Sequence, residues 1–267
     1  MRSPAGTVDD LDWPAMLSAA ADGCGMRAVY QPIVDLASGT IAGYEALIRF
    51  VGYPVRSPVP WLRAAGARRR GAELQAAALR AALDHRGALP GGCFLSVNVA
   101  PGVLHHRAIR EVWADEGDLH GLIVELTEPV ADYASLEPDL DRLRSAGALI
   151  AVDDAGYHGL TQLSALRPTL IKLDRALVAD IDTDEAKRAL VETIGTIAAR
   201  MDARLVAEGV ERQGELDTLA ALPVPLAQGY HLGRPARPWA SLTGTSLTGA
   251  ERAQAAPVRT AVTATVL

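Results

Sequence analysis

The sequence predicts an α/β fold in which eight strands close into a (β/α)8 barrel. Short β-rich runs alternate with Ala- and Leu-rich helical stretches along most of the chain. This is the pattern of strand and crossover-helix units around a parallel sheet. The chain has 267 residues, of which 49% are hydrophobic, and barrels of this kind commonly reach that length as one domain.

Eight apolar runs are expected to be the strands. They are residues 28–36, 43–50, 93–100, 122–128, 149–154, 170–174, 204–210 and 226–232. The first two runs are separated by a short connection through Ser-Gly-Thr, which is typical of a hairpin. We therefore expect one antiparallel strand near the start of an otherwise parallel barrel.

A short helix is expected before the first strand, within an N-terminal segment of residues 1–23. Asp12 fits the position of an N-cap, Pro14 the first turn and Gly23 the stop. The barrel domain is then expected over residues 24–240. Residues 241–267, rich in Ala, Thr, Gly and Ser, are expected to be a tail or a weakly packed extension.

The longest helical stretch covers residues 182–203. Within it, Leu190, Ile194, Ile197 and Met201 recur at three- and four-residue steps. This spacing predicts one apolar stripe that packs on the sheet.

Composition excludes several classes of protein. A net charge of -6 argues against binding to a nucleic-acid duplex, which relies on Lys and Arg. No run reaches the roughly 18 apolar residues of a membrane span, and no secretory h-region is visible. The two cysteines, Cys24 and Cys93, are too few for a disulfide framework. We expect a cytoplasmic protein without a membrane segment.

Seven of the eight strand runs carry polar residues at or near their ends. Each residue alone could cap the following helix. Together they predict a site, because strand ends converge at one mouth of a (β/α) barrel. The residues are Glu45, Asn98, Glu125, Asp153, Asp154, Lys172, Glu208 and Gln228.

Several carboxylates at one mouth would repel one another unless protons or cations neutralise them. Oxygen ligands without His or Cys favour Mg²⁺ or Mn²⁺. The adjacent Asp153 and Asp154 could flank two such ions, an arrangement that suits displacement at phosphorus. From the residues alone, another hard-metal barrel enzyme, such as an enolase-like lyase, remains open.

Two cationic side chains fit this scheme. Lys172 should point into the barrel with Leu170 and Asp174, where it could hold a water or stabilise negative charge. The alternative is a structural ion pair with Asp174 or another interior acid. Arg49 shares a strand face with Glu45 and could bind a phosphate through its guanidinium, or it could be an exposed strand-end charge.

The motifs "YQPIVDL", "YEALIR", "VELTE", "VDDAG", "IKLD", "VAEGVE" and "QGYHLGRP" resemble, in order and spacing, the EAL-domain family of cyclic-di-GMP phosphodiesterases. The similarity runs from about Met16 to Pro235. It implies a TIM-like barrel that hydrolyses cyclic di-GMP to linear pGpG with a two-metal site of Mg²⁺ or Mn²⁺. It also implies a homodimer.

The resemblance assigns roles to individual residues. The implied metal ligands are Glu45, Asn98, Glu125, Asp153, Asp154 and Glu208. The implied catalytic residues are Lys172, which would hold the water, with Glu45, Asp153 and Asp154. The implied substrate-binding residues are Gln31, Leu47, Arg49 and Gln228. Glu128 and Glu211 are implied as acids that support the loop after the paired aspartates.

That loop departs from the family. It follows Asp153 and Asp154, has Ala155 where the family has Phe, and is shorter than the family's loop. The alternative function is therefore a weak or inactive domain that acts as a cyclic-di-GMP receptor or protein-interaction module. No sensor domain is recognisable in the sequence, so a separate sensory or regulatory protein is an expected partner.

Overall fold

The computed structural model describes residues 11–53, 55, 57–127, 134–153 and 166–239. Its eight strands form a closed barrel in chain order, so the predicted fold class is confirmed. The strands are β1 (Met26–Asp35), β2 (Thr40–Phe50), β3 (Phe94–Val99), β4 (Leu122–Leu126), β5 (Leu149–Val152), β6 (Leu170–Leu173), β7 (Arg204–Ala207) and β8 (Leu226–Ala227).

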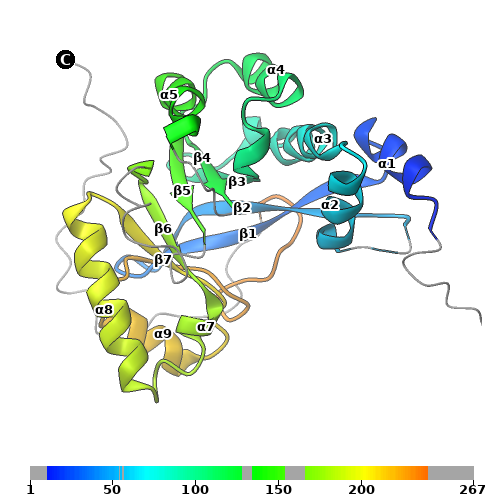
Figure 1. Ribbon diagram of the computed structural model, residues 1–267. Coiled ribbons are helices and arrows are strands. Elements are labelled where there is room, and N and C mark those ends of the chain that lie inside the picture. Colours follow the sequence, from blue (N-terminus) through cyan, green and yellow to red (C-terminus); the bar gives the residue numbers. More distant parts are fainter. Residues whose placement is uncertain (1–10, 54, 56, 128–133, 154–165, 240–267) are drawn as a thin grey trace, which may run out of the picture.

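The first strand is antiparallel to both of its neighbours, as the short connection predicts. β1 pairs antiparallel with β2 and β8, and the other neighbouring strands pair in parallel. β2 pairs with β3 only from Gly43 to Ala46, yet its pairing with β1 continues to Phe50. The β1–β2 ribbon therefore extends beyond the barrel mouth, towards α1 and α2 in Figure 1.

Helices surround the strands (Figure 1). They are α1 (Trp13–Ala21), α2 (Pro58–Ala67), α3 (Gly71–Leu83), α4 (Arg107–Glu116), α5 (Glu137–Ser145), α7 (Arg175–Val178), α8 (Glu185–Arg200) and α9 (Gln213–Ala220). The predicted first helix is present, and the Asp12 carboxylate accepts a hydrogen bond from the Ala15 N–H at 3.1 Å. No helix in the described part of the chain is both long and apolar enough to cross a bilayer.

Three apolar clusters hold these elements together. The largest lies between the strands and the outer helices. A second surrounds Trp61, which stacks on Phe50 at 3.9 Å between ring centroids and meets the edge of Trp13. The third, called here the interior cluster, fills the barrel below its mouth; its members are Ile33, Ile123, Ala151, Leu170, Val206 and Leu226.

The predicted apolar stripe of α8 is confirmed at Ile194 and wrong at Leu190. The buried residues are Val191, Ile194, Gly195 and Ala198, whereas Leu190 is 46% exposed. Small residues explain the difference, because they let the helix approach its neighbours closely. A Cβ on Gly195 would lie 2.5 Å from Pro223 Cγ.

Candidate active site

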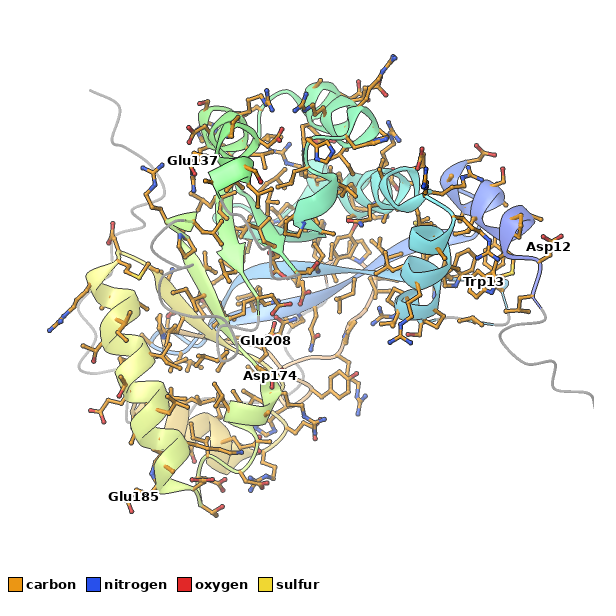
Figure 2. The ribbon with its side chains drawn as sticks, in the orientation of Figure 1. Asp12, Trp13, Glu137, Asp174, Glu185 and Glu208 are labelled. Atoms are coloured by element: carbon orange, nitrogen blue, oxygen red, sulfur yellow. The ribbon has the colours of Figure 1, made fainter. Side chains whose placement is uncertain are left out.

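Lys172 lies among three glutamates at the carboxyl ends of the barrel strands. Its Nζ is 2.8 Å from Glu125 Oε2, 2.5 Å from Glu208 Oε1 and 3.5 Å from Glu45 Oε2. Lys172 and Glu125 are almost completely buried, whereas the Glu208 side chain keeps 24% of its exposure. Figure 2 shows Glu208 beside the strand ends, far from Glu137 and Glu185 on the outer helices.

Two residues on β3 donate hydrogen bonds to Oε1 of Glu45 and of Glu125, the oxygens that do not face Lys172. Asn98 Nδ2 donates to Glu45 Oε1 at 2.8 Å, and Ser96 Oγ donates to Glu125 Oε1. Asn98 is opposite Glu125 in the β3–β4 register, and Ser96 is opposite Glu45 in the β2–β3 register. The parallel ladder therefore places all four side chains on the inward face of the sheet.

Two glutamines complete this wall. Gln228 Nε2 donates to Glu45 Oε2 at 2.8 Å and to Gln31 Oε1 at 3.1 Å. Gln31 Nε2 donates to the Gly233 carbonyl at 3.0 Å. Among the described residues, no group donates to Gln228 Oε1, although it is buried. Its acceptor capacity is therefore unused within the described part of the chain.

Close backbone packing fixes the position of Gln228. The next residue, Gly229, lies against the Val210 backbone, and a Cβ there would be 2.1 Å from the Val210 carbonyl oxygen. Any larger residue would push β8 away from the loop that carries Glu208. The loop and the segment after β8 also share two hydrogen bonds, from the Val210 N–H to the Gln228 carbonyl and from the His231 N–H to the Val210 carbonyl.

Burial gives the glutamates different proton affinities. It raises the pKa of Glu125 to about 7 and that of Glu208 to about 8, even with the Lys172 ammonium beside them. Burial would also raise the pKa of Glu45, but Lys172 and the amides of Asn98 and Gln228 lower it. For Lys172 itself, burial is outweighed by the surrounding carboxylates, which raise its pKa well above the ordinary value. The site thus has more carboxylates than one ammonium can neutralise.

A hollow of about 310 Å³, called here the polar hollow, opens over these groups. Its lining is mostly polar: Gln31, Glu45, Leu47, Asp153, Lys172, Arg175, Glu208, Gly209, Glu211, Gln228, Gly229 and Tyr230. A second space of about 240 Å³, the apolar hollow, lies between β2, α2, α3 and β3 and also contacts Leu47. Its walls include Leu62, Leu74 and Leu79 together with Arg49 and Asn98. The two hollows together can receive a ligand with both charged and flat apolar parts.

The structure brings most of the predicted site residues together. Glu45, Asp153, Lys172, Glu208, Gln228, Gln31 and Leu47 line the polar hollow, and Asn98 and Glu125 contact its glutamate and lysine walls. β5 ends at Val152, so Asp153 directly follows the strand, as expected. Asp154, Glu128 and the shortened loop lie outside the described residues, as does the predicted tail of residues 241–267.

Arg49 and Glu211 have different neighbours from those of the central cluster. Arg49 lies on the ribbon beyond the barrel, borders the apolar hollow and donates to the Ile48 carbonyl at 2.9 Å. Glu211 forms an ion pair with Arg175 at 2.9 Å. Asp174, considered as a partner for Lys172, instead caps α7 by accepting from the Ala176 N–H at 2.5 Å.

Sequence reasoning missed three residues at this site. Ser96 precedes Asn98 by two positions on the same strand face, and that spacing was the available signal. Arg175 directly follows the motif that contains Lys172. Tyr230 is 49% exposed on the wall of the polar hollow, with the Arg234 guanidinium 4.2 Å from its ring centroid; nothing in the sequence distinguished it from a core aromatic residue.

The donor set suits a hard divalent cation. All its donors are carboxylate or amide oxygens, which Mg²⁺ and Mn²⁺ prefer. Within the described residues, no three His, Cys, Asp or Glu side chains already stand close enough together to hold a metal ion. The Lys172 ammonium lies between the glutamates, so a cation that binds to them would have to displace it.

The sequence matches the EAL domain family over residues 15–235. This chain belongs to the EAL domain family. The match confirms the resemblance that the motifs indicated. The closed barrel agrees with solved EAL structures.

Several known proteins are similar to this EAL domain. A cyclic di-GMP phosphodiesterase of Pseudomonas aeruginosa is 30% identical over 230 residues, which are 80% of this chain and 39% of that protein. BlrP1 of Klebsiella pneumoniae, solved with manganese and cyclic di-GMP, is 31% identical, with a TM-score of 0.70 over 80% of this chain and 56% of its own.

A second solved structure, the PaMucR phosphodiesterase in complex with cyclic di-GMP, is 26% identical. Its TM-score is 0.72, and the match covers 85% of this chain and 98% of that chain. The chain spans a smaller share of the curated relatives it matches, between 26% and 39% of their length.

Proposed function

We propose that this EAL domain is a cyclic-di-GMP phosphodiesterase that opens the ring to linear pGpG. The observation that carries the proposal is the Lys172–glutamate cluster under the polar hollow. The relatives and solved structures named above support the substrate, because their names include cyclic di-GMP.

The residues that would hold two divalent cations are Glu45, Asn98, Glu125, Asp153, Asp154 and Glu208, with Gln228 beside them. Bound Mg²⁺ or Mn²⁺ would lower the pKa of the attacking water and offset charge that develops at phosphorus. The carboxylates must be deprotonated to do this, so Glu125 and Glu208 would release protons on binding. Lys172 would then donate hydrogen bonds to the water and hold it in line with the scissile bond.

The reaction breaks one P–O3′ bond of the cyclic dinucleotide. The water oxygen forms the new bond to phosphorus, and the protons of the water pass to the O3′ leaving group and to solvent. The products are one 5′-phosphate and one 3′-hydroxyl on the same linear dinucleotide. No co-reactant other than water is required.

Substrate groups would occupy both hollows. Gln31 and Leu47 line the polar hollow next to the carboxylates, where a phosphate would lie. Arg49 borders the apolar hollow. Its guanidinium would bind a phosphate oxygen of the substrate. The apolar hollow, with its leucine walls, suits one purine base.

The alternative function is binding without turnover. The shortened sequence after Asp153 and Asp154, with Ala155 in place of Phe, favours it. A receptor for cyclic di-GMP, or a protein-interaction module, would keep the barrel and both hollows and lose the productive placement of the cations.

One experiment separates these functions. The purified chain is incubated with cyclic di-GMP and Mg²⁺ or Mn²⁺, and pGpG is measured by chromatography, with Glu45→Ala as the control. Appearance of pGpG with the wild type alone supports the phosphodiesterase. Calorimetric binding of cyclic di-GMP without any pGpG supports the receptor, and absence of both contradicts the phosphodiesterase and the receptor and leaves the protein-interaction module.

We further propose a cytoplasmic homodimer that responds to a separate sensory or regulatory protein. Free cysteines at Cys24 and Cys93 are compatible with a reducing compartment. Light scattering of the purified protein tests the dimer directly.

A further inference from the structure

Ser96 places a hydroxyl in the apolar interior of the barrel. Ser96 is 1% exposed. It pairs with Ile123 of β4, a member of the interior cluster. A hydroxyl in such surroundings destabilises the fold unless it has a hydrogen-bond partner. A serine at this position therefore needs an explanation, since alanine or valine would fill the space at no such cost.

The partner of this hydroxyl is a single carboxylate oxygen. Ser96 Oγ contacts Glu125 Oε1, while the other available acceptor, the Ile123 carbonyl, is farther away at 3.4 Å. A hydroxyl has one proton to donate, so the closer oxygen receives it. The second oxygen, Glu125 Oε2, is then left to face Lys172 Nζ at 2.8 Å.

The same arrangement is present at Glu45, on the other side of β3. Asn98 Nδ2 binds Glu45 Oε1 at 2.8 Å, and Glu45 Oε2 faces Lys172 Nζ at 3.5 Å. β3 thus has two inward side chains, two residues apart, and each holds one oxygen of a glutamate on a different neighbouring strand. Ser96 does for Glu125 on β4 what Asn98 does for Glu45 on β2.

From this geometry we infer that Ser96 is a positioning residue, whose hydroxyl fixes Glu125 Oε1 so that Oε2 is presented to the cation site. The inference rests on the proposed function, in which Glu125 is a cation ligand. Hydrogen-bond partners of metal ligands orient them, and their loss typically weakens metal affinity by about 10- to 100-fold. Ser96 itself contacts neither the substrate nor the reacting atoms.

The test uses three variants of the full chain and measures Mn²⁺ affinity by calorimetry without nucleotide. Ser96→Ala should weaken Mn²⁺ binding by about tenfold or more. Ser96→Thr keeps the hydroxyl and should lose much less Mn²⁺ affinity than Ser96→Ala. Leu95→Val is the matched control, because Leu95 is the adjacent buried residue and belongs to the cluster between strands and helices.

Two results would overturn the inference: wild-type Mn²⁺ affinity in Ser96→Ala, or a loss in Ser96→Thr as large as that in Ser96→Ala. Crystal structures of the wild type and Ser96→Ala add a readout that needs no metal. The Glu125 carboxylate should leave its rotamer in Ser96→Ala, and an unchanged rotamer contradicts the inference. Failure of the proposed function would instead appear as a wild type that forms no pGpG, whatever the outcome for Ser96.

Discussion

Lys172 Nζ lies 2.8 Å from Glu125 Oε2, and both side chains are at most 3% exposed. A buried ion pair of this kind is weak evidence for a purely structural role, because desolvation offsets much of the attraction between the charges. Here the ammonium also contacts Glu45 and Glu208. It is therefore a fixed cation at the centre of an otherwise negative site.

Replacing Lys172 by Ala should lower kcat for cyclic-di-GMP hydrolysis at least 100-fold, about the range for a group that assists proton transfer or holds the nucleophile. Mn²⁺ binding should persist, because the carboxylate ligands remain. Initial rates of pGpG formation and Mn²⁺ calorimetry check the two parts. Lys187→Ala is the control; Lys187 is the other lysine of the sequence and donates to the Ala179 carbonyl on the outer surface. Wild-type turnover in Lys172→Ala would refute its role.

Mn²⁺ affinity should rise with pH across the neutral range. Burial raises the pKa of Glu125 to about 7 and that of Glu208 to about 8. Below these values the carboxylates hold protons that compete with the cation, so affinity rises by up to about tenfold per pH unit for each proton released. Calorimetry in buffers below and above this range measures the dependence, and equal affinity throughout would contradict it.

Glu125 and Glu208 also make the stability of the metal-free protein depend on pH. A carboxyl whose pKa is raised on folding stabilises the fold fully below its ordinary pKa of 4.5, and this contribution is lost as pH rises through 7 to 8. The Tm of the metal-free chain should therefore fall over that interval, and added Mn²⁺ should restore it most at the alkaline end. Thermal unfolding with EDTA and with Mn²⁺ checks both changes.

Tyr230→Ala should raise KM about tenfold, with a smaller effect on kcat. The ring lies on the wall of the polar hollow, half exposed, with Arg234 over one face. Stacking of a base on an aromatic side chain is worth about 1–3 kcal/mol, and this ring is placed to receive a purine of the substrate. Steady-state kinetics check the split between KM and kcat. Tyr230→Phe keeps the ring and should behave as wild type; a KM unchanged in Tyr230→Ala would exclude the contact.

Glu215→Ala should destabilise the fold by about 3 kcal/mol. The buried carboxylate accepts hydrogen bonds from the backbone N–H groups of Asp180, Glu211 and Arg212, and each N–H left unsatisfied costs about 1–3 kcal/mol. Urea unfolding measures the loss. Glu192→Ala, on the exposed side of α8, should change stability little.

The effect of Glu215 should also depend on pH. Burial would raise its pKa, but the three backbone N–H groups and Arg212 lower it below the ordinary 4.5. A lowered pKa means that its stabilisation is present above 4.5 and is lost as pH falls below it. The difference between wild type and Glu215→Ala should therefore shrink in acid, and a constant difference would argue against an ionised Glu215.

The alternation of apolar runs and helical stretches was sufficient to predict the barrel and its antiparallel first strand. Strand lengths were predicted less well. The last run was expected over residues 226–232, whereas β8 contains only Leu226 and Ala227. The backbone after Gln228 packs on Val210 instead of extending the strand, and such a contact between distant segments leaves no periodic signal.

The sequence was sufficient to predict the site residues that lie at the carboxyl ends of the strands. Glu125, Lys172 and Glu208 converge because each lies two positions after a residue of the interior cluster, and Glu45 lies on the same inward face of β2. Arg49 shares a strand face with Glu45, but this did not predict its neighbours. β2 continues past the barrel, so Arg49 lies at the apolar hollow. Ser96 was missed because its spacing from Asn98 indicates a shared strand face but does not identify Glu125 as its partner.

Gln228, near the end of the described barrel, donates hydrogen bonds to Gln31 on the first strand and Glu45 on the second. During synthesis on the ribosome, β2 leaves the exit tunnel long before β8. The pocket is therefore assembled last, and a nascent chain that ends before Gln228 has neither a sealed sheet nor a complete wall for a ligand. Premature termination products of this gene should be unable to sequester the nucleotide.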